Sequence, residues 1–289
     1  MRHALVFGGS GQIGRSLLAQ LLREGWRVTA LSRQPQRDQP GLQWLRGDFD
    51  AMPVLLPRVD AIVSCGPLDG FARWYDTADI DAGRVVAFGS TSVTVKRGSA
   101  DARERDVAQR LRAGEEGVFA TAARRAAQAT LLRPTLVYGA GRDATLTRIA
   151  RLARRWGRFP LPRKATGLRQ PVHVDDLAAA AFAALGSVSA HGQTYALPGG
   201  ETLAYREMVR RVLAALDPPP TLIELPSPLF NLALAAAKLA GGTGLGEAAV
   251  QRMRADLVFD DAPARRDLGY APRPFRPTAR MFEARDDEA

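Results

Sequence analysis

Residues 4–14 read Ala-Leu-Val-Phe-Gly-Gly-Ser-Gly-Gln-Ile-Gly, and this stretch decides the fold that we expect. The four apolar residues predict a short buried strand, and the glycines lead into residues 12–23, where apolar side chains recur at helical spacing. Glycines at positions 9, 11 and 14 satisfy the pattern G-x-G-x-x-G, and those at positions 8, 11 and 14 satisfy G-x-x-G-x-x-G. Small residues let the backbone approach a pyrophosphate, which the positive end of the helix attracts. The motif by itself leaves open a turn that is rich in glycine for steric reasons only.

The end of the second predicted strand, residues 27–31, indicates which dinucleotide would bind. An acidic residue there would hold the ribose 2′-hydroxyl of NAD, but this chain has Ser32 and Arg33. A hydroxyl and a guanidinium would instead bind a 2′-phosphate, so the sequence favours NADP(H) over NAD(H). The alternative is that Arg33 is one more surface arginine, because arginine supplies all but three of the 40 basic residues.

The remaining elements extend the pattern of the first. Apolar and β-branched runs at residues 42–46, 61–64, 85–88, 129–133 and 193–197 predict further strands, and residues 101–127 predict a long helix. We therefore expect an α/β fold, a doubly wound parallel Rossmann sheet with a smaller C-terminal substrate region. Residues 1–142 and 170–197 would form the NADP-binding Rossmann domain, and residues 143–169 and 198–289 the smaller substrate or partner region.

Small and polar residues follow several of these strands, at the edge of the sheet where dinucleotides bind. Asp48 could accept a hydrogen bond from an adenine amine, or could simply belong to a turn. Cys65 follows a buried strand, where a packing thiol is favoured over a nucleophile. The residues expected to bind the cofactor are Gly8, Gly9, Ser10, Gly11, Gln12, Ile13, Gly14, Ser32, Arg33, Asp48, Phe49, Ser64, Cys65, Gly66 and Ser90.

Several motifs occur in order along the chain: the glycine motif, Gly47-Asp48, residues 64–67 and residues 88–92. In these motifs and in their order, the sequence resembles the short-chain dehydrogenase/reductase superfamily. Residues 132–139 (Leu-Arg-Pro-Thr-Leu-Val-Tyr-Gly) and 171–178 (Pro-Val-His-Val-Asp-Asp-Leu-Ala) point to its extended and atypical branches, the NAD-dependent epimerase/dehydratase-like proteins. The likeness covers about residues 4–180. It implies a Rossmann domain that holds the dinucleotide and a smaller C-terminal region that closes over the substrate.

The sequence departs from this family at the catalytic dyad. Active members carry Tyr-x-x-x-Lys, in which the lysine lowers the pKa of the tyrosine so that the phenol can transfer a proton. No tyrosine here has a lysine four residues later, and residues 93–116, where the pair should lie, contain no tyrosine. Thr91 matches the family's serine or threonine position. The standard dyad chemistry is therefore excluded on this interpretation.

The sequence identifies no catalytic residue, and Thr91 and Tyr138 are the candidates that it offers. Tyr138 could serve as an unconventional acid, although a packing role is favoured, and His173 is interpreted as a structural histidine more than a general acid. Asp175 or Asp176 is expected to cap the helix that follows.

Two functions remain open. One is an NADP(H)-binding oxidoreductase or epimerase that acts on an anionic small molecule. The other is a non-catalytic NADP(H) sensor or accessory scaffold protein, similar to the reductase-like accessory subunit of respiratory complex I, with residues 229–239 and 265–270 as a partner surface.

The net charge is +10, and although arginine is scattered through nearly every segment, one stretch, residues 144–174, has eight basic residues and no acidic one. These arginines could meet a diphosphate or carboxylate of the substrate, or could form a solvated helix face. Nucleic-acid binding is disfavoured because only Trp156 and Phe159 are interleaved with the charges. The basic residues are Arg148, Arg151, Arg154, Arg155, Arg158, Arg163, Lys164 and Arg169.

Composition narrows the function classes further. A single cysteine excludes an intramolecular disulfide framework, and three histidines give no cluster at zinc-ligand spacing, so we expect no metal site. No apolar run is long enough to span a membrane, and the apolar stretch at the N-terminus is too short for a targeting segment. We therefore expect a cytoplasmic protein with no membrane partner. The sequence predicts neither the substrate nor the oligomeric state.

Overall fold

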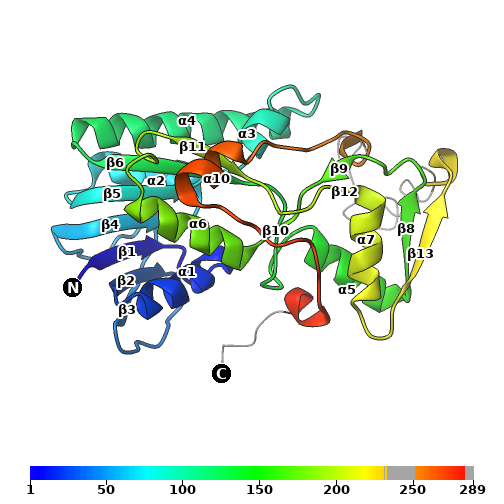
Figure 1. The fold of residues 1–289 in the computed structure, drawn as a ribbon, viewed down its shortest axis with the longest axis horizontal. Coiled ribbons are helices and arrows are strands. Elements are labelled where there is room, and N and C mark those ends of the chain that lie inside the picture. The colour runs from blue at the N-terminus through cyan, green and yellow to red at the C-terminus, as the bar shows by residue number, and fades with distance from the viewer. Residues whose placement is uncertain (231, 233–250, 284–289) are drawn as a thin grey trace. The chain divides into compact units, whose positions relative to one another are not determined.

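The computed structural model describes residues 1–230, 232 and 251–283, and these form two compact units (Figure 1). The first unit consists of residues 1–135, 174–197 and 260–272. The second consists of the described residues within 136–173, 198–259 and 273–289. Most of the proposed partner surface at residues 229–239 lies outside the described residues.

The first unit contains a seven-stranded parallel sheet in the order β11-β6-β5-β4-β1-β2-β3. The chain builds the sheet outward from β1 in one direction and then from β4 in the other, which is the doubly wound arrangement that the sequence predicts. The elements are β1 (His3–Phe7), α1 (Gln12–Arg23), β2 (Arg27–Ser32), β3 (Leu42–Arg46), β4 (Arg58–Ser64), α2 (Leu68–Thr77), β5 (Asp81–Phe88), α3 (Ser92–Val95), α4 (Ala102–Arg124), β6 (Gln128–Pro134), α6 (Val174–Gly186), β11 (Thr194–Leu197) and α10 (Ala262–Leu268).

Helices cover the sheet in two pairs, α1 with α6 and α2 with α4 (Figure 1). Alternate residues of β1 point to opposite faces, and Leu5 and Phe7 pack into the core beneath α2 and α4. The ring of Phe7 lies 4.4 Å from that of Trp74, centroid to centroid, and 5.7 Å from that of Phe71. This aromatic cluster fixes the end of β1 from which the glycine loop starts.

Helix α2 is one element that the sequence analysis did not assign. Gly70 lies inside it, and glycine is a poor helix former. The structure explains its presence, because a Cβ atom at Gly70 would lie 2.8 Å from Cδ2 of Phe49. Packing of the Phe49 ring therefore decides the residue type at that position.

Residues 260–272 belong to the first unit, whereas we expected them in the smaller region. Helix α10 packs against α6 and β11. The hydroxyl of Tyr195 donates a hydrogen bond to the Asp267 carboxylate (2.9 Å), and the hydroxyl of Ser187 donates one to the Asp267 carbonyl (2.8 Å). These contacts tie the segment to the end of the sheet. The division into a cofactor domain and a substrate region remains a prediction.

The start of α6 also differs from the expectation. The helix begins at Val174, so Asp175 and Asp176 lie in its first turn and neither is the N-cap. Negative charge in the first turn still favours the helix dipole. The Asp175 carboxylate accepts a hydrogen bond from the hydroxyl of Ser16 on α1 (2.8 Å), which ties the two helices together.

The second unit combines short strand pairs with helices around its own core. Strands β7 and β10 are parallel, as are β8 and β13, and β9 and β12 are antiparallel. Leu146, Ile149, Met208, Val209 and Phe275 are among its buried residues. The elements are β7 (Val137–Tyr138), α5 (Leu146–Trp156), β8 (Arg158–Pro162), β9 (Leu168–Arg169), β10 (Val172–His173), β12 (Leu203–Ala204), α7 (Tyr205–Ala214), β13 (Thr221–Leu225) and the 3₁₀ helix η1 (Ala279–Phe282).

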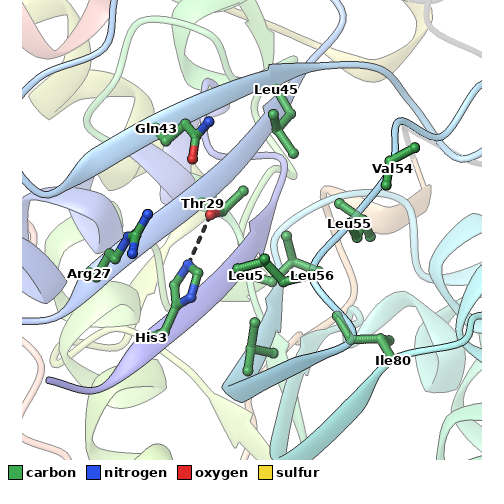
Figure 2. A pocket seen from close by; sticks show the side chains of 11 residues that line it. His3, Leu5, Arg27, Thr29, Gln43, Leu45, Val54, Leu55, Leu56 and Ile80 are labelled. Atoms are coloured by element: carbon green, nitrogen blue, oxygen red, sulfur yellow. Dashed lines mark hydrogen bonds between the residues drawn. The ribbon is translucent and has the colours of Figure 1, made fainter.

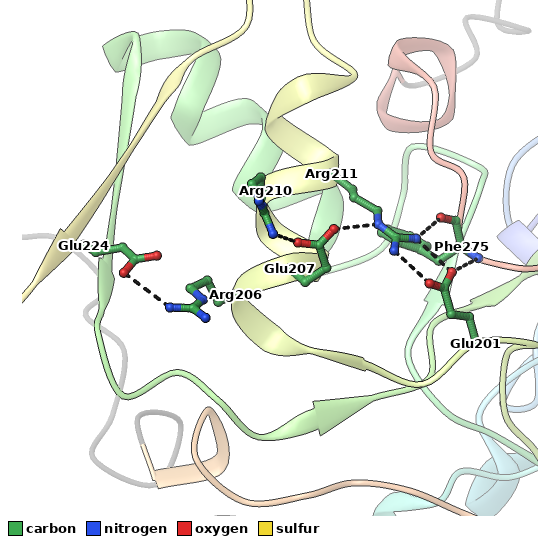
Figure 3. A network of polar contacts seen from close by, with 7 residues as sticks. All are labelled: Glu201, Arg206, Glu207, Arg210, Arg211, Glu224 and Phe275. Carbon is green, nitrogen blue, oxygen red and sulfur yellow. Dashed lines mark hydrogen bonds and ion pairs between the residues drawn. The ribbon is translucent and has the colours of Figure 1, made fainter.

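A polar network anchors the chain near Phe275 to helix α7 (Figure 3). The guanidinium of Arg211 donates to both carboxylate oxygens of Glu201 (2.8 Å each), to Glu207 (2.9 Å) and to the carbonyl of Phe275 (3.0 Å). The backbone N–H of Phe275 donates to Glu201 in turn (3.2 Å). Hydrogen bonds from Arg211 hold the pKa of Glu201 below its ordinary value. The network therefore fixes the buried ring of Phe275 in the core of the second unit.

Among the described residues, no helix is long and apolar enough to cross a membrane. In the same part of the chain, no group of three or more histidine, cysteine, aspartate or glutamate residues is placed to hold a metal ion.

Candidate cofactor site

The glycine loop joins β1 to α1 at the carboxyl edge of the sheet. Gly8 has a φ of +69°, in the left-handed region, and its carbonyl accepts the N–H of Gly11 (2.9 Å). A Cβ atom at Gly14 would lie 2.1 Å from that same carbonyl oxygen. The turn geometry therefore accounts for Gly8 and Gly14 within the chain itself.

Gly11 has a different reason to be glycine. It has extended backbone, and a Cβ atom there would meet one close atom, the Gly8 oxygen at 3.0 Å. It is also the N-cap of α1, where no side chain caps the helix and no acidic residue lies in the first turn. A helix start of this kind attracts an anion, and the missing side chain at position 11 leaves its approach open. This fits a pyrophosphate.

Two buried oxygen atoms beside the loop also fit a ligand. The side-chain oxygens Oε1 of Gln12 and Oγ of Ser64 are buried without a hydrogen-bond partner among the described residues. Gln12 is the first residue of α1, and Ser64 ends β4, directly beside Phe7 in the register of the sheet. Buried polar atoms normally have partners, so these two atoms suit donors supplied by a bound molecule.

The end of β2 lies against the glycine loop. The hydroxyl of Ser32 is buried, donates to the hydroxyl of Ser10 (3.3 Å) and accepts the N–H of Gln34 (3.2 Å). Arg33 follows directly and is exposed, and it forms no ion pair with a described residue. The structure therefore brings a hydroxyl beside the loop, with a free guanidinium next to it in the chain.

Asp48 and Phe49 have structural roles in the chain as it stands. One carboxylate oxygen of Asp48 accepts hydrogen bonds from the N–H groups of Asp50 (3.0 Å) and Ala51 (2.8 Å). Asp48 therefore belongs to a turn, which was the alternative to its role in adenine binding. The ring of Phe49 stacks on Phe7 with 5.2 Å between centroids. Recognition of adenine by Asp48 stays a prediction.

The segments after β4 and β5 complete this edge. A Cβ atom at Gly8 would lie 2.8 Å from the carbonyl carbon of Cys65, so the glycine loop touches this segment. Burial raises the pKa of the Cys65 thiol to about 12, which keeps it protonated at neutral pH and fits the packing role. The hydroxyl of Ser90 accepts the N–H of Ser92 (3.1 Å). The structure gives Gly66 no contact that decides its role.

Thr91 is buried and doubly tied to Pro134. Its hydroxyl donates to the Pro134 carbonyl (3.1 Å), and its backbone N–H donates to the same oxygen (3.2 Å). The Pro134 carbonyl keeps the hydrogen bond from the Thr91 N–H when the Thr91 hydroxyl rotates away. The hydroxyl can therefore donate to another acceptor without leaving that carbonyl unpaired.

The long helix α4 contains neither tyrosine nor lysine. It contributes instead a buried carboxylate, Glu115, that accepts two hydrogen bonds from the guanidinium of Arg133, one from Nε at 2.7 Å and one from Nη2 at 2.5 Å. A Cβ atom at Gly89 would lie 3.1 Å from Glu115, so this ion pair lies under the turn after β5. The sequence pattern did not predict this ion pair. The available signal was an acidic residue within the buried stripe that includes Gly114, Val118 and Ala122.

Tyr138 and His173, in the second unit, pack as the sequence analysis favoured. Tyr138 is 1% exposed, and its ring meets His173 edge-on at 5.1 Å and Phe275 edge-on at 4.9 Å. A Cβ atom at Gly139 would lie 2.5 Å from Nε2 of His173. Both rings therefore have a packing role.

The basic stretch does not act as one surface. Arg169 is buried, and its guanidinium donates to the carbonyls of Leu168 (2.6 Å) and Ala255 (2.8 Å), so it is not available to an anionic ligand. Arg154 pairs with Glu283 at 3.0 Å. The other members are exposed: Arg148, Arg151, Arg155, Arg158, Arg163 and Lys164.

Comparisons with known proteins bear on the family and the fold of the chain. The model of the NAD dependent epimerase/dehydratase family matches residues 4–87 and 108–197. The 2-alkyl-3-oxoalkanoate reductase of Stenotrophomonas maltophilia is 28% identical over an alignment that covers 93% of this chain and 94% of that protein.

A second relative is a subunit of a larger assembly. The mitochondrial NADH dehydrogenase [ubiquinone] 1 alpha subcomplex subunit 9 of Arabidopsis thaliana is 26% identical, over 78% of this chain and 61% of that protein. Among solved structures, UDP-glucuronic acid 4-epimerase from Bacillus cereus in complex with NAD superposes with a TM-score of 0.66 over 93% of each chain, at 15% identity. That likeness shows a shared fold.

Proposed function

This chain belongs to the NAD dependent epimerase/dehydratase family, and from that membership we propose that it is an NADP(H)-dependent oxidoreductase acting on a small anionic carbonyl compound. The observation that carries the proposal is the open approach at Gly11, above a helix start with no side-chain cap. The name of its reductase relative, a 2-alkyl-3-oxoalkanoate reductase, describes a substrate with a carboxylate and a ketone. This supports the class of substrate.

The residues that would hold the cofactor follow from the site. The N–H groups at the start of α1 would bind the pyrophosphate. The Ser32 hydroxyl and the Arg33 guanidinium would bind the 2′-phosphate, because a guanidinium pairs with phosphate through directed, charge-assisted hydrogen bonds. When bound, the nicotinamide supplies the hydride that a carbonyl reduction requires.

Thr91 would polarise the substrate carbonyl. Its hydroxyl can leave Pro134 for the substrate oxygen, since the Thr91 N–H still satisfies the Pro134 carbonyl. The same hydroxyl would donate a proton to the alkoxide that forms and regain one from solvent. A positioned general acid contributes about 10²–10⁴ in rate, so a site without the Tyr-x-x-x-Lys pair should turn over slowly.

A second candidate function is binding of NADP(H) without catalysis, as a sensor or an accessory subunit. The absence of tyrosine and lysine from α4 favours it, as does the buried, edge-on packing of Tyr138. The relative named as a subunit of NADH dehydrogenase is consistent with such a role.

Consumption of NADPH, followed at the nicotinamide absorbance band with a panel of 3-oxo acids, separates the two functions. We expect slow turnover that Thr91→Ala lowers about 10-fold or more, and that Thr91→Ser largely restores. Tyr138→Phe should change kcat less than about threefold, because its ring packs in the core. Tight NADPH binding with no turnover of any substrate would favour the accessory role instead. Unchanged kcat in Thr91→Ala would show that this hydroxyl is not the donor.

A further inference from the structure

The first unit contains a cavity of about 210 Å³ that the proposed function does not use (Figure 2). It lies over β1, β2 and β3, toward the ends at which these strands begin, and it is lined by His3, Arg27 and Gln43 among others. The glycine loop follows the opposite, carboxyl ends of the same strands. The cavity is therefore separate from the candidate cofactor site.

The cavity exists because the connection from β3 to β4 is short and not helical. Residues 47–57 form no helix, and they include Pro53 and Pro57, which disfavour one. Leu55 from this connection packs against the core, but Val54 is 96% exposed and Leu56 is 50% exposed. The sheet face beside this connection is therefore not fully covered, and the exposed apolar side chains of Val54 and Leu56 lie at the entrance of the cavity.

The two sides of the cavity differ in chemistry. Leu5, Leu45, Val59 and Ile80 give it apolar walls, together with the side chains of residues 54–56. Figure 2 shows the polar side chains His3, Arg27, Thr29 and Gln43 gathered on the opposite side.

The polar side carries one full charge. Nε2 of His3 is hydrogen-bonded to the hydroxyl of Thr29 (2.9 Å), which lies opposite Gln43 in the register of the sheet. Burial and the nearby Arg27 guanidinium lower the pKa of His3, so its imidazole is neutral at neutral pH. Arg27 lies opposite His3, is exposed, and forms no ion pair with a described residue.

We propose that this cavity binds a small carboxylate with an aliphatic or aromatic body. The carboxylate would pair with the Arg27 guanidinium and the Gln43 amide, and the body would lie against Leu5, Leu45 and Ile80. The volume is below the roughly 300 Å³ at which sites for drug-sized ligands begin, which limits the ligand to about the size of hexanoate or benzoate. The inference does not depend on the proposed function, because it uses no residue of the cofactor site.

Titration of the full chain with hexanoate, followed by calorimetry and by backbone NMR shifts, tests the proposal. We expect saturable binding with shifts at Leu5, Thr29 and Leu45. Hexanol, which has a similar body without the charge, should bind about 10-fold more weakly. Arg27→Gln should weaken hexanoate by a similar factor. The matched control Arg23→Gln, which removes an exposed charge from the end of α1 outside the cavity, should leave binding unchanged.

Two further arms make the test specific. Leu56→Ser, at a half-exposed position, should weaken hexanoate and hexanol alike, because it removes apolar surface that both probes would contact. Saturating NADPH should not compete with hexanoate. Competition, equal affinity in wild type and Arg27→Gln, or no saturable binding would each overturn the proposal.

Discussion

The glycine loop and helix α4 belong to the same Rossmann unit but offer a bound coenzyme different things. At the loop, Gly11 leaves the helix start open, and Gln12 and Ser64 present buried oxygens without partners. At α4, the buried carboxylate is that of Glu115, and Arg133 already satisfies it. The glycine loop therefore has polar groups available to a ligand, whereas the buried carboxylate of α4 is already paired within the protein.

The difference shows that holding a dinucleotide and reacting with it are separable properties. The pyrophosphate site consists of backbone N–H groups and small residues, and it needs no titratable side chain. Proton transfer needs a positioned acid, and α4 contains neither the tyrosine nor the lysine that would provide one. A chain of this family can therefore have the first property without the residues that the standard chemistry requires.

The largest expected effect is on the free energy of unfolding, and it tests whether the ion pair between Glu115 and Arg133 stabilises the fold. Arg133→Leu would leave the Glu115 carboxylate, whose side chain is 8% exposed, without a partner, and we expect a loss of about 3 kcal/mol in the free energy of unfolding. Urea denaturation measures this loss. Glu115→Leu combined with Arg133→Leu should recover most of it, because no unpaired charge is left.

The control for that variant is Arg124→Leu. Arg124 pairs with Asp76, and both side chains are more than half exposed, so the loss should stay below about 1 kcal/mol. Equal losses of unfolding free energy in Arg133→Leu and Arg124→Leu would mean that the Glu115–Arg133 pair does not stabilise the fold more than an exposed ion pair does.

The next effect concerns the loop. Gly11→Val should weaken NADPH binding about 100-fold, because the side chain would fill the approach to the start of α1. The added Cβ atom meets one close atom, so the fold should persist, which circular dichroism checks. Gly98→Val, at a glycine with open space around it, should leave affinity unchanged. Wild-type affinity in Gly11→Val would place the dinucleotide elsewhere.

A smaller effect tests which dinucleotide the loop region selects. Arg33→Glu should weaken NADPH about 20-fold and NADH less than about threefold, since NADH lacks the 2′-phosphate. Arg37→Glu, an exposed arginine in the same connection, serves as the matched control in the same fluorescence titrations. If both coenzymes weaken equally in Arg33→Glu, this residue does not read the extra phosphate.

The smallest effect lies in the second unit, whose ion-pair network is more exposed than Glu115–Arg133. Arg211→Leu should cost about 1 kcal/mol at neutral pH, and Arg210→Leu, which loses one pair at a 66% exposed side chain, clearly less. The folded-state pKa of Glu201 is lowered, so its contribution is full above the ordinary value of about 4.3 and is lost as the pH falls through the folded pKa.

Denaturation at neutral and acidic pH checks both parts of this prediction. The difference between wild type and Arg211→Leu should shrink below about pH 4. A difference that is independent of pH would assign the effect to packing instead of charge.

Much of the fold was accessible from the sequence, because apolar runs bounded by glycine and proline mark the strands. The strand at residues 42–46 was predicted with the bounds that the structure gives, and the helix at 12–23 likewise. Helix α2 was missed because the reason for Gly70 is the ring of Phe49, a contact between segments.

The site was predictable in its backbone and less so in its side chains. The glycine motif located the loop, since spacing alone sets that geometry. Burial of Arg169 could not be foreseen, because its carbonyl partners at Arg252 and Ala255 are 83 and 86 residues away. The cavity beside residues 47–57 follows from a missing helix, for which Pro53 and Pro57 were the signal.

Calorimetric titration of the wild-type chain with NADPH and with NADH tests the central claim most directly. We predict saturable heat from NADPH, with an affinity at least about 10-fold higher than that for NADH. The absence of heat from both coenzymes would contradict the claim that the open helix start at Gly11 is a dinucleotide site.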